Sequence, residues 1–157
     1  MRHQRQFTRK LLDRKPPSGD VAPMQVLQPN GWPRPKGYAN GVVAEGRVVV
    51  LAGMIGWNAE ERFESDDLVE QVRQALANIR VLLGEAGARP EHLARLTWYL
   101  VDMDGFRARG REIGVAYREV LGRDFPPMAA VGVTSLVEAR AKVEIEATAV
   151  IPFAEGR

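Results

Sequence analysis

Residues 142–150, with the sequence Lys-Val-Glu-Ile-Glu-Ala-Thr-Ala-Val, decide the fold class of this chain. Apolar and polar side chains alternate along the segment, the period of two that a β-strand shows when one face lies on a core. The apolar positions are Val143, Ile145, Ala147 and Ala149. The chain therefore contains a sheet, and at least one face of this strand must be covered.

Two helices are expected upstream to provide that cover. The first begins near Asp66, with Ser65 or Asp66 as its N-cap and Gly87 as a left-handed stop. Its apolar residues recur at helical spacing and are Leu68, Val72, Ala75, Ile79 and Leu82.

The second helix is expected over residues 105–121 and ends at Gly122. Gly110 and Gly114 weaken it, each by about 1 kcal/mol against alanine, which tight packing against the sheet would explain. Its buried stripe consists of Phe106, Ile113, Tyr117 and Val120.

Four further strands are expected, over residues 42–43, 47–51, 96–101 and 128–133. Glu45-Gly46 lies between the first two and predicts a hairpin. The order β-β-α-β-α-β-β is typical of an α+β domain with a mixed sheet and two helices on one face.

The second face of this sheet is also expected to be buried. Residues 48–51 are Val-Val-Val-Leu without alternation, as in a strand buried on both faces, and both faces of residues 96–101 are substantially apolar. In a monomer such a sheet would leave an exposed apolar surface, and such surfaces usually mark interfaces. The residues therefore predict a homo-oligomer without specifying its number of copies.

The composition, 45% hydrophobic and 27% charged over 157 residues, is typical of one soluble domain. The net charge of +2 arises in the first fifteen residues, and the remaining chain is slightly acidic. We expect a basic, flexible extension over residues 1–25 and a single domain over residues 26–157. An anionic-surface or RNA contact and a transit-like leader are alternatives for the extension. No nucleic-acid partner is expected for the domain.

Several kinds of site are excluded or disfavoured by residue content. The chain has no cysteine, which excludes disulfides, thiolate zinc sites and cysteine nucleophiles. His3 and His92 belong to no metal cluster or Ser-His-Asp pattern, and no phosphate-binding loop is present. No metal or cofactor is therefore expected. No apolar stretch is long enough to cross a bilayer, so we expect a cytoplasmic protein with no membrane partner.

Several segments taken together resemble the RidA/YjgF family, which also carries the older names endoribonuclease L-PSP and translation initiation inhibitor. The likeness covers residues 38–150, in order and with suitable spacing. The segments that carry it are Pro35–Gly41, Leu51–Ile55, the first helix with Gln71, Ala75, Asn78 and Ile79, its end at Glu85–Ala88, Thr97–Met103, and Lys142–Val150.

The resemblance implies a chorismate-mutase-like subunit and a homotrimer whose sheets form a central barrel. It also implies a small-molecule cleft at each subunit interface. Well-studied members hydrolyse reactive enamines and imines, such as 2-aminoacrylate, to a 2-oxo acid and ammonia. In those members an arginine holds the substrate carboxylate, while a carboxylate with backbone groups positions water against the iminium carbon.

The family's site residues carry over only in part. Tyr38 matches the pocket tyrosine, and Glu144 matches the glutamate that orients water. Met128 stands at the position of the arginine, and Ala52 and Met54 stand where the family has serine and glutamine. Methionine cannot pair with a carboxylate, a contact worth about 1.5–3 kcal/mol, so a less polar or uncharged ligand is expected. Two further candidates for ligand binding are Trp57 and Ala130.

Structural roles are the alternatives for these residues. Glu144 and Glu146 could both be solvated or ion-paired at the sheet rim, and Tyr38 could pack its ring on the sheet edge. Arg140 or Arg123 could supply the missing positive charge.

At the level of function, hydrolysis of an enamine or imine in a cleft containing Tyr38 and Glu144 is the leading hypothesis. A non-catalytic binding protein for a small apolar metabolite is the second hypothesis. An endoribonuclease is less favoured, because the domain lacks an RNA-binding signature.

Overall fold

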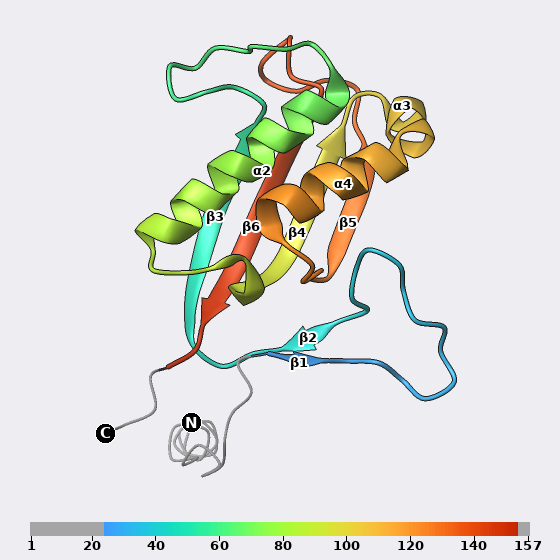
Figure 1. Cartoon of the computed structure of the whole chain (residues 1–157), viewed down its shortest axis with the longest axis vertical. Coiled ribbons are helices and arrows are strands. Elements are labelled where there is room, and N and C mark those ends of the chain that lie inside the picture. The colour runs from blue at the N-terminus through green and yellow to red at the C-terminus, as the bar shows by residue number, and fades with distance from the viewer. Residues whose placement is uncertain (1–23, 154–157) are drawn as a thin grey trace, which may run out of the picture.

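The computed structural model describes residues 24–153, whose main sheet has four strands in the order β3-β6-β4-β5 (Figure 1). Strand β6 runs antiparallel to both of its neighbours, and β4 and β5 are parallel. Helices α2 and α4 lie across one face of this sheet. The predicted α+β architecture is therefore confirmed. The bounds are β3 (Arg47–Ile55), α2 (Leu68–Glu85), β4 (Leu93–Leu100), α4 (Gly110–Leu121), β5 (Met128–Gly132) and β6 (Val143–Ile151).

The core fills the space between the sheet and these two helices. Four alternating residues of β6 face it and are at most 3% exposed, as the alternation predicts: Val143, Ile145, Ala147 and Ala149. Helix α2 supplies the opposite wall, although Leu83 rather than the expected Leu82 is fully buried at its C-terminal end. The remaining fully buried residues of that wall are Val72, Ala75, Leu76 and Ile79.

Helix α2 begins slightly later than predicted. Its N-cap is Asp67, not Ser65 or Asp66, and the carboxylate of Asp67 accepts a hydrogen bond from the N–H of Val69 at 2.9 Å. Gly87 follows the helix with a φ of 73°, which confirms the expected left-handed stop.

The predicted single helix over residues 105–121 is wrong, because Arg109 divides it into α3 (Met103–Ala108) and α4. Arg109 has non-helical dihedral angles, and its guanidinium bridges Asp67 at the start of α2 and Glu112 of α4. This pair of acidic partners raises the pKa of Arg109. Arg109, at the break, therefore links the start of α2 to the start of α4.

The predicted hairpin around Glu45-Gly46 is also wrong. Strand β2 (Val42–Val43) pairs with β1 (Gln25–Val26), and β3 pairs with β6. The nine residues of β3 form hydrogen bonds along nearly their whole length with β6, a strand of equal length, and the two residues of β2 are too few for such a ladder. Strand β1 crosses the boundary expected between extension and domain, and residues 1–23 of that extension lie outside the described residues. A 3₁₀ turn, η1 (Pro90–His92), precedes β4.

The face of the sheet away from the helices is open in the single chain. Val48 and Val50 are 64% and 76% exposed there, which is the apolar surface that the sequence predicts for a single copy. The same face carries Val131 from β5 and the polar side of β6. The homo-oligomer that would cover it stays a prediction. Among the described residues, no helix is both long enough and apolar enough to span a membrane.

Replacing Gly114 with alanine is expected to stabilise the protein by about 1 kcal/mol, because glycine is a poor residue inside a helix. A Cβ atom at Gly114 would approach only the side chain of Arg118, at 3.4 Å, and one at Gly110 would have no neighbour within 4 Å. Tight packing against the sheet is therefore not the reason for these glycines. Denaturant unfolding measures the effect, and a lower free energy of unfolding in Gly114→Ala would contradict the expectation.

Candidate functional site

Glu144 lies on the open face of the sheet. It is partly buried on β6, opposite Tyr99 of β4 and Ile55 of β3. Within residues 24–153 its carboxylate accepts no hydrogen bond and forms no ion pair. A partly buried carboxylate without an internal partner can accept hydrogen bonds from water or a ligand.

Glu146, two residues further along β6, has a different environment. Its Oε1 accepts a hydrogen bond from the hydroxyl of Tyr99 at 2.8 Å, and this bond raises the pKa of Tyr99. Glu146 also borders a hollow of about 140 Å³ on the open face. The two glutamates thus share one face, but of the two only Glu146 has a partner among the described residues. The other residues of the hollow are Val50, Leu51, Arg95, Thr97, Ala147 and Thr148.

Gln71 of α2 holds together the chain segments around the start of β6. It is 1% exposed, and its side-chain amide donates to the carbonyl oxygens of Ser65 and Arg140, each at 3.0 Å. Its Oε1 accepts from the N–H of Lys142 at 2.7 Å. The hydrogen bonds of this buried amide therefore hold two backbone segments: Ser65, just before α2, and residues 140–142, just before the strand that carries Glu144.

Asn78, two turns along α2, holds the end of β3. Its side-chain amide donates to the carbonyl oxygens of Ile55 and Trp57, at 3.1 and 2.9 Å. The ring of Trp57 lies 6.2 Å from that of Phe63, measured between centroids. Trp57 is therefore placed just beyond the strand end, partly buried and anchored through its backbone.

Arg140 does not supply a free positive charge near Glu144. Its guanidinium pairs with Asp66 at 3.0 Å, a contact that lowers the pKa of Asp66, and lies 5.4 Å from the centroid of the Phe63 ring. Arg123 forms no ion pair within the described part of the chain. Arg140 is thus already paired, whereas the alternative in which the exposed Arg123 supplies the missing positive charge stays a prediction.

Tyr38, Met128 and Ala130 lie together at the β5 edge of the sheet. The N–H of Ala39 donates to the carbonyl oxygen of Pro126 at 3.2 Å, which places Tyr38 beside the start of β5. Tyr38 is 46% exposed, so its ring is not buried against the sheet edge. Met128 packs partly buried against the core, and Ala130 is exposed.

The other candidates lie towards the β3 edge of the sheet: Ala52 and Met54 on β3, Trp57 just beyond its end, and Glu144 on the neighbouring strand β6. Ala52 is exposed, whereas Met54 faces the core side opposite Ile145. The sequence alone could not show that Met54 points away from the open face, since a bulge in β3 changes the alternation.

The candidate residues therefore form two separate groups within one chain. Glu144 is level with Val131 of β5, two strands away, and Met128 lies three residues before Val131. Strand geometry then separates Glu144 and Met128 by about 14 Å between Cα atoms. One copy of the chain does not bring the two groups into one cleft.

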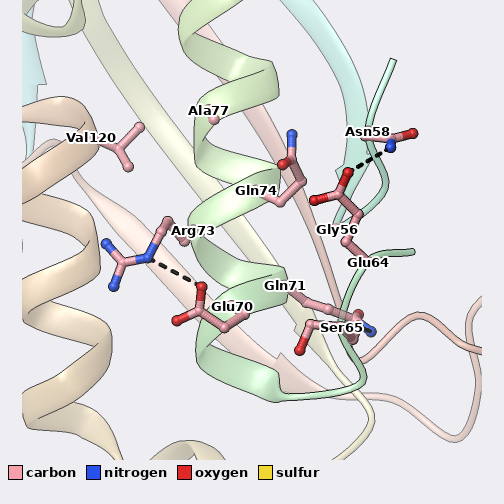
Figure 2. A pocket seen from close by; sticks show the side chains of 10 residues that line it. All are labelled: Gly56, Asn58, Glu64, Ser65, Glu70, Gln71, Arg73, Gln74, Ala77 and Val120. Atoms are coloured by element: carbon pink, nitrogen blue, oxygen red, sulfur yellow. Dashed lines mark hydrogen bonds and ion pairs between the residues drawn. The ribbon is translucent and has the colours of Figure 1, made fainter. Parts of the chain in front are cut away.

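A larger hollow, of about 540 Å³, lies elsewhere (Figure 2). It runs over the outer surface of α2, between the loop that follows β3 and helix α4. Glu64 accepts from Asn58 at 2.9 Å, and Glu70 lies 3.5 Å from Arg73, so its charged groups largely have protein partners. None of the residues proposed from the sequence lines it. The residues that do are Gly56, Asn58, Glu64, Ser65, Glu70, Gln71, Arg73, Gln74, Ala77 and Val120.

Sequence reasoning missed the supporting residues around Glu144. Gln71 and Asn78 appeared only as parts of a helix pattern, although a buried amide at those positions signals a hydrogen-bonding role. Gly53 appeared only as part of the segment Leu51–Ile55 and Gly56 carried no signal, because the importance of each depends on contacts with distant residues. A Cβ atom at Gly56 would lie 2.5 Å from Cβ of Gln71.

Comparison with known proteins agrees with this architecture. The family model described as Endoribonuclease L-PSP matches residues 33–151. A RutC family protein of Pyrococcus abyssi is 31% identical over 126 residues, which cover 80% of this chain and 95% of that protein. The 2-iminobutanoate/2-iminopropanoate deaminase of Capra hircus is 31% identical over 114 residues, 72% of this chain and 79% of that protein.

Among solved structures, a Rid-family protein of unknown function from Yersinia pestis superposes with a TM-score of 0.74 at 30% identity. The match covers 82% of this chain and 99% of that one. Since the family model, the relatives and the fold agree over most of the chain, this protein belongs to the RidA/YjgF family.

Proposed function

We propose that this protein hydrolyses uncharged or weakly polar imines and enamines in clefts formed between copies of the chain. The observation that carries the proposal is the partly buried carboxylate of Glu144, which has no protein partner within residues 24–153. The separation of Glu144 from Tyr38 and Met128 supports a cleft shared by two copies. In it, the β5 edge of one copy would face the β3–β6 side of its neighbour.

Hydrolysis of an imine needs one group that accepts a proton from water and one that orients the substrate. Glu144 accepts a proton from a water molecule as that water attacks the iminium carbon, forming a carbinolamine. Return of the proton to nitrogen lets ammonia leave and the carbonyl form. Tyr38, half exposed at the facing edge, can donate a hydrogen bond to the substrate and orient it. The products are ammonia and a ketone or aldehyde.

Substrate preference follows from Met128. A carboxylated imine entering this cleft would lose the paired contact of an arginine fork and would be desolvated without compensation. A methionine adapts instead to irregular apolar groups. The deaminases of Capra hircus and Homo sapiens are named for 2-imino acids, so this protein would differ from them in the charge of its substrate.

The same apolar positions favour a second candidate function, the non-catalytic binding of a small apolar metabolite. Met128 and Ala52 offer no group for proton transfer, and ligand binding there needs no turnover. Such a protein would bind its ligand equally well when Glu144 is replaced by glutamine.

The test measures ammonia release from freshly generated imines, one series carboxylated and one uncharged, by wild type and by Met128→Arg. We expect wild type to prefer the uncharged series, and Met128→Arg to raise kcat/KM for the carboxylated series by about 10- to 100-fold, the value of one charge-assisted contact. Met128→Gln, which is polar but uncharged, is the matched control and should not produce the gain. Absence of turnover by wild type on both series would contradict the proposed hydrolysis and favour the binding protein.

A further inference from the structure

The edge strand β3 contains a bulge next to Glu144. Its ladder with β6 is regular up to Leu51 and resumes at Met54 with a shift of register. Ala52 and Gly53 therefore lie opposite a single residue, Glu146. Bulges of this kind bend a strand and often redirect a side chain beside an active site.

Gly53 leaves the space that the side chain of Glu144 occupies. A Cβ atom built on Gly53 would lie 2.6 Å from Cδ and 2.7 Å from Cγ of Glu144, and closer still to one carboxylate oxygen. Real Cβ atoms do not approach other heavy atoms so closely. The carboxylate of Glu144 thus lies directly over the backbone of Gly53.

The conformation of Gly53 does not by itself require glycine. Gly53 does not have a positive φ, so an alanine could adopt the same backbone conformation. The glycine is instead needed for space, and the group that fills the space is the unpartnered carboxylate. Gly56 contrasts with it, because a Cβ there would lie 2.6 Å from the backbone Cα of Gln71 and would disturb the core.

From these contacts we infer that Gly53 is a positioning residue, which holds Glu144 at the working position by leaving out a side chain. The inference rests on the proposed function in that Glu144 is taken to orient the attacking water. Any side chain at position 53 would turn the carboxylate away from that position. Because the displaced group is the flexible end of a side chain, the fold itself would survive.

The first test is a double-mutant cycle on thermal stability, which needs no substrate. Gly53→Ala is expected to lower Tm in the wild-type background and to leave Tm unchanged or raise it when Glu144 is already alanine. Gly84→Ala, at an exposed helical glycine with nothing within 4 Å, is the control and should have the same effect in both backgrounds. Equal changes of Tm for Gly53→Ala in both backgrounds would overturn the inference.

The second test follows the carboxylate itself. In protein labelled with ¹³C at the glutamate carboxyl carbon, the resonance of Glu144 is identified by its loss in Glu144→Gln. We expect Gly53→Ala to move this resonance, and Gly84→Ala to leave it in place. An unmoved resonance in Gly53→Ala would contradict the inference.

Turnover then separates this inference from the proposed function. Gly53→Ala is expected to lower kcat as far as Glu144→Gln does, with KM changed less, and the double variant should lose no more. Loss of turnover in Glu144→Gln but not in Gly53→Ala would overturn the positioning role while leaving the proposed function intact. Full turnover in Glu144→Gln would instead refute the proposed function, whereas the stability cycle would still decide whether Gly53 positions the carboxylate.

Discussion

Replacing Glu144 with glutamine is expected to lower kcat for imine hydrolysis by about 10²- to 10⁴-fold, the usual contribution of one general base. Glutamine has almost the same shape but cannot accept the proton of the attacking water. Since the carboxylate has no protein partner among the described residues, the substitution breaks no internal contact. The free energy of unfolding should therefore stay the same or rise, which denaturant titration measures beside the ammonia assay.

Glu146→Gln is the matched control for this experiment. It makes the same chemical change two residues along the same strand, on the same face, where the carboxylate accepts a hydrogen bond from Tyr99. A glutamine can still accept that bond, so kcat should change by less than about tenfold. Equal losses in the two variants would show that the charge of this face, and not Glu144 in particular, supports turnover.

Replacing Gln71 with leucine is expected to destabilise the protein by about 3–5 kcal/mol. The substitution removes three hydrogen bonds and leaves the carbonyl oxygens of Ser65 and Arg140 and the N–H of Lys142 without their partner. Each such loss costs about 1–3 kcal/mol when the group stays buried, and part of this cost is recovered if water enters. Leucine has a similar volume to glutamine, so the loss of stability would measure the lost hydrogen bonds and not the opening of a cavity.

Gln74→Leu is the control on the same helix. The side chain of Gln74 donates one hydrogen bond, to Asn78 at 2.9 Å, and is only partly buried. Its replacement should cost about 1 kcal/mol or less. Unfolding should be compared at one protein concentration, because an oligomer makes apparent stability depend on concentration. A Gln71→Leu variant as stable as Gln74→Leu would mean that the Gln71 network does not support the fold.

Much of the fold could be predicted because local patterns and tertiary structure agree. The alternation along residues 142–150 and the helical spacing after Asp66 gave strand and helix of the correct type. Pairing could not be predicted as well. Glu45-Gly46 indicated a turn, but the pairing partner of a strand depends on which segment buries its apolar face. The partner of β3 is β6, which lies almost a hundred residues later in the chain.

The candidate site was predictable in its residue types and not in its arrangement. The resemblance identified Glu144 and Tyr38. No local pattern could show that Glu144 lies on β6, two strands away from β5, while Tyr38 lies beside the start of β5. Met54 was misplaced for a physical reason. The bulge at Ala52–Gly53 shifts the alternation of β3, so that Met54 faces the core. The helix break at Arg109 escaped notice because it depends on an ion pair with distant Asp67.

The central claim, that each site joins Tyr38 of one copy to Glu144 of another, is tested most directly by complementation. Tyr38→Ala and Glu144→Gln are each expected to be inactive alone. After the two variants are unfolded, mixed in equal amounts and refolded together, ammonia release should recover to about one quarter of the wild-type value, because each cleft draws its two halves from copies chosen at random. Recovery at that level would establish a shared site. Activity no higher than that of the separate variants would contradict the account.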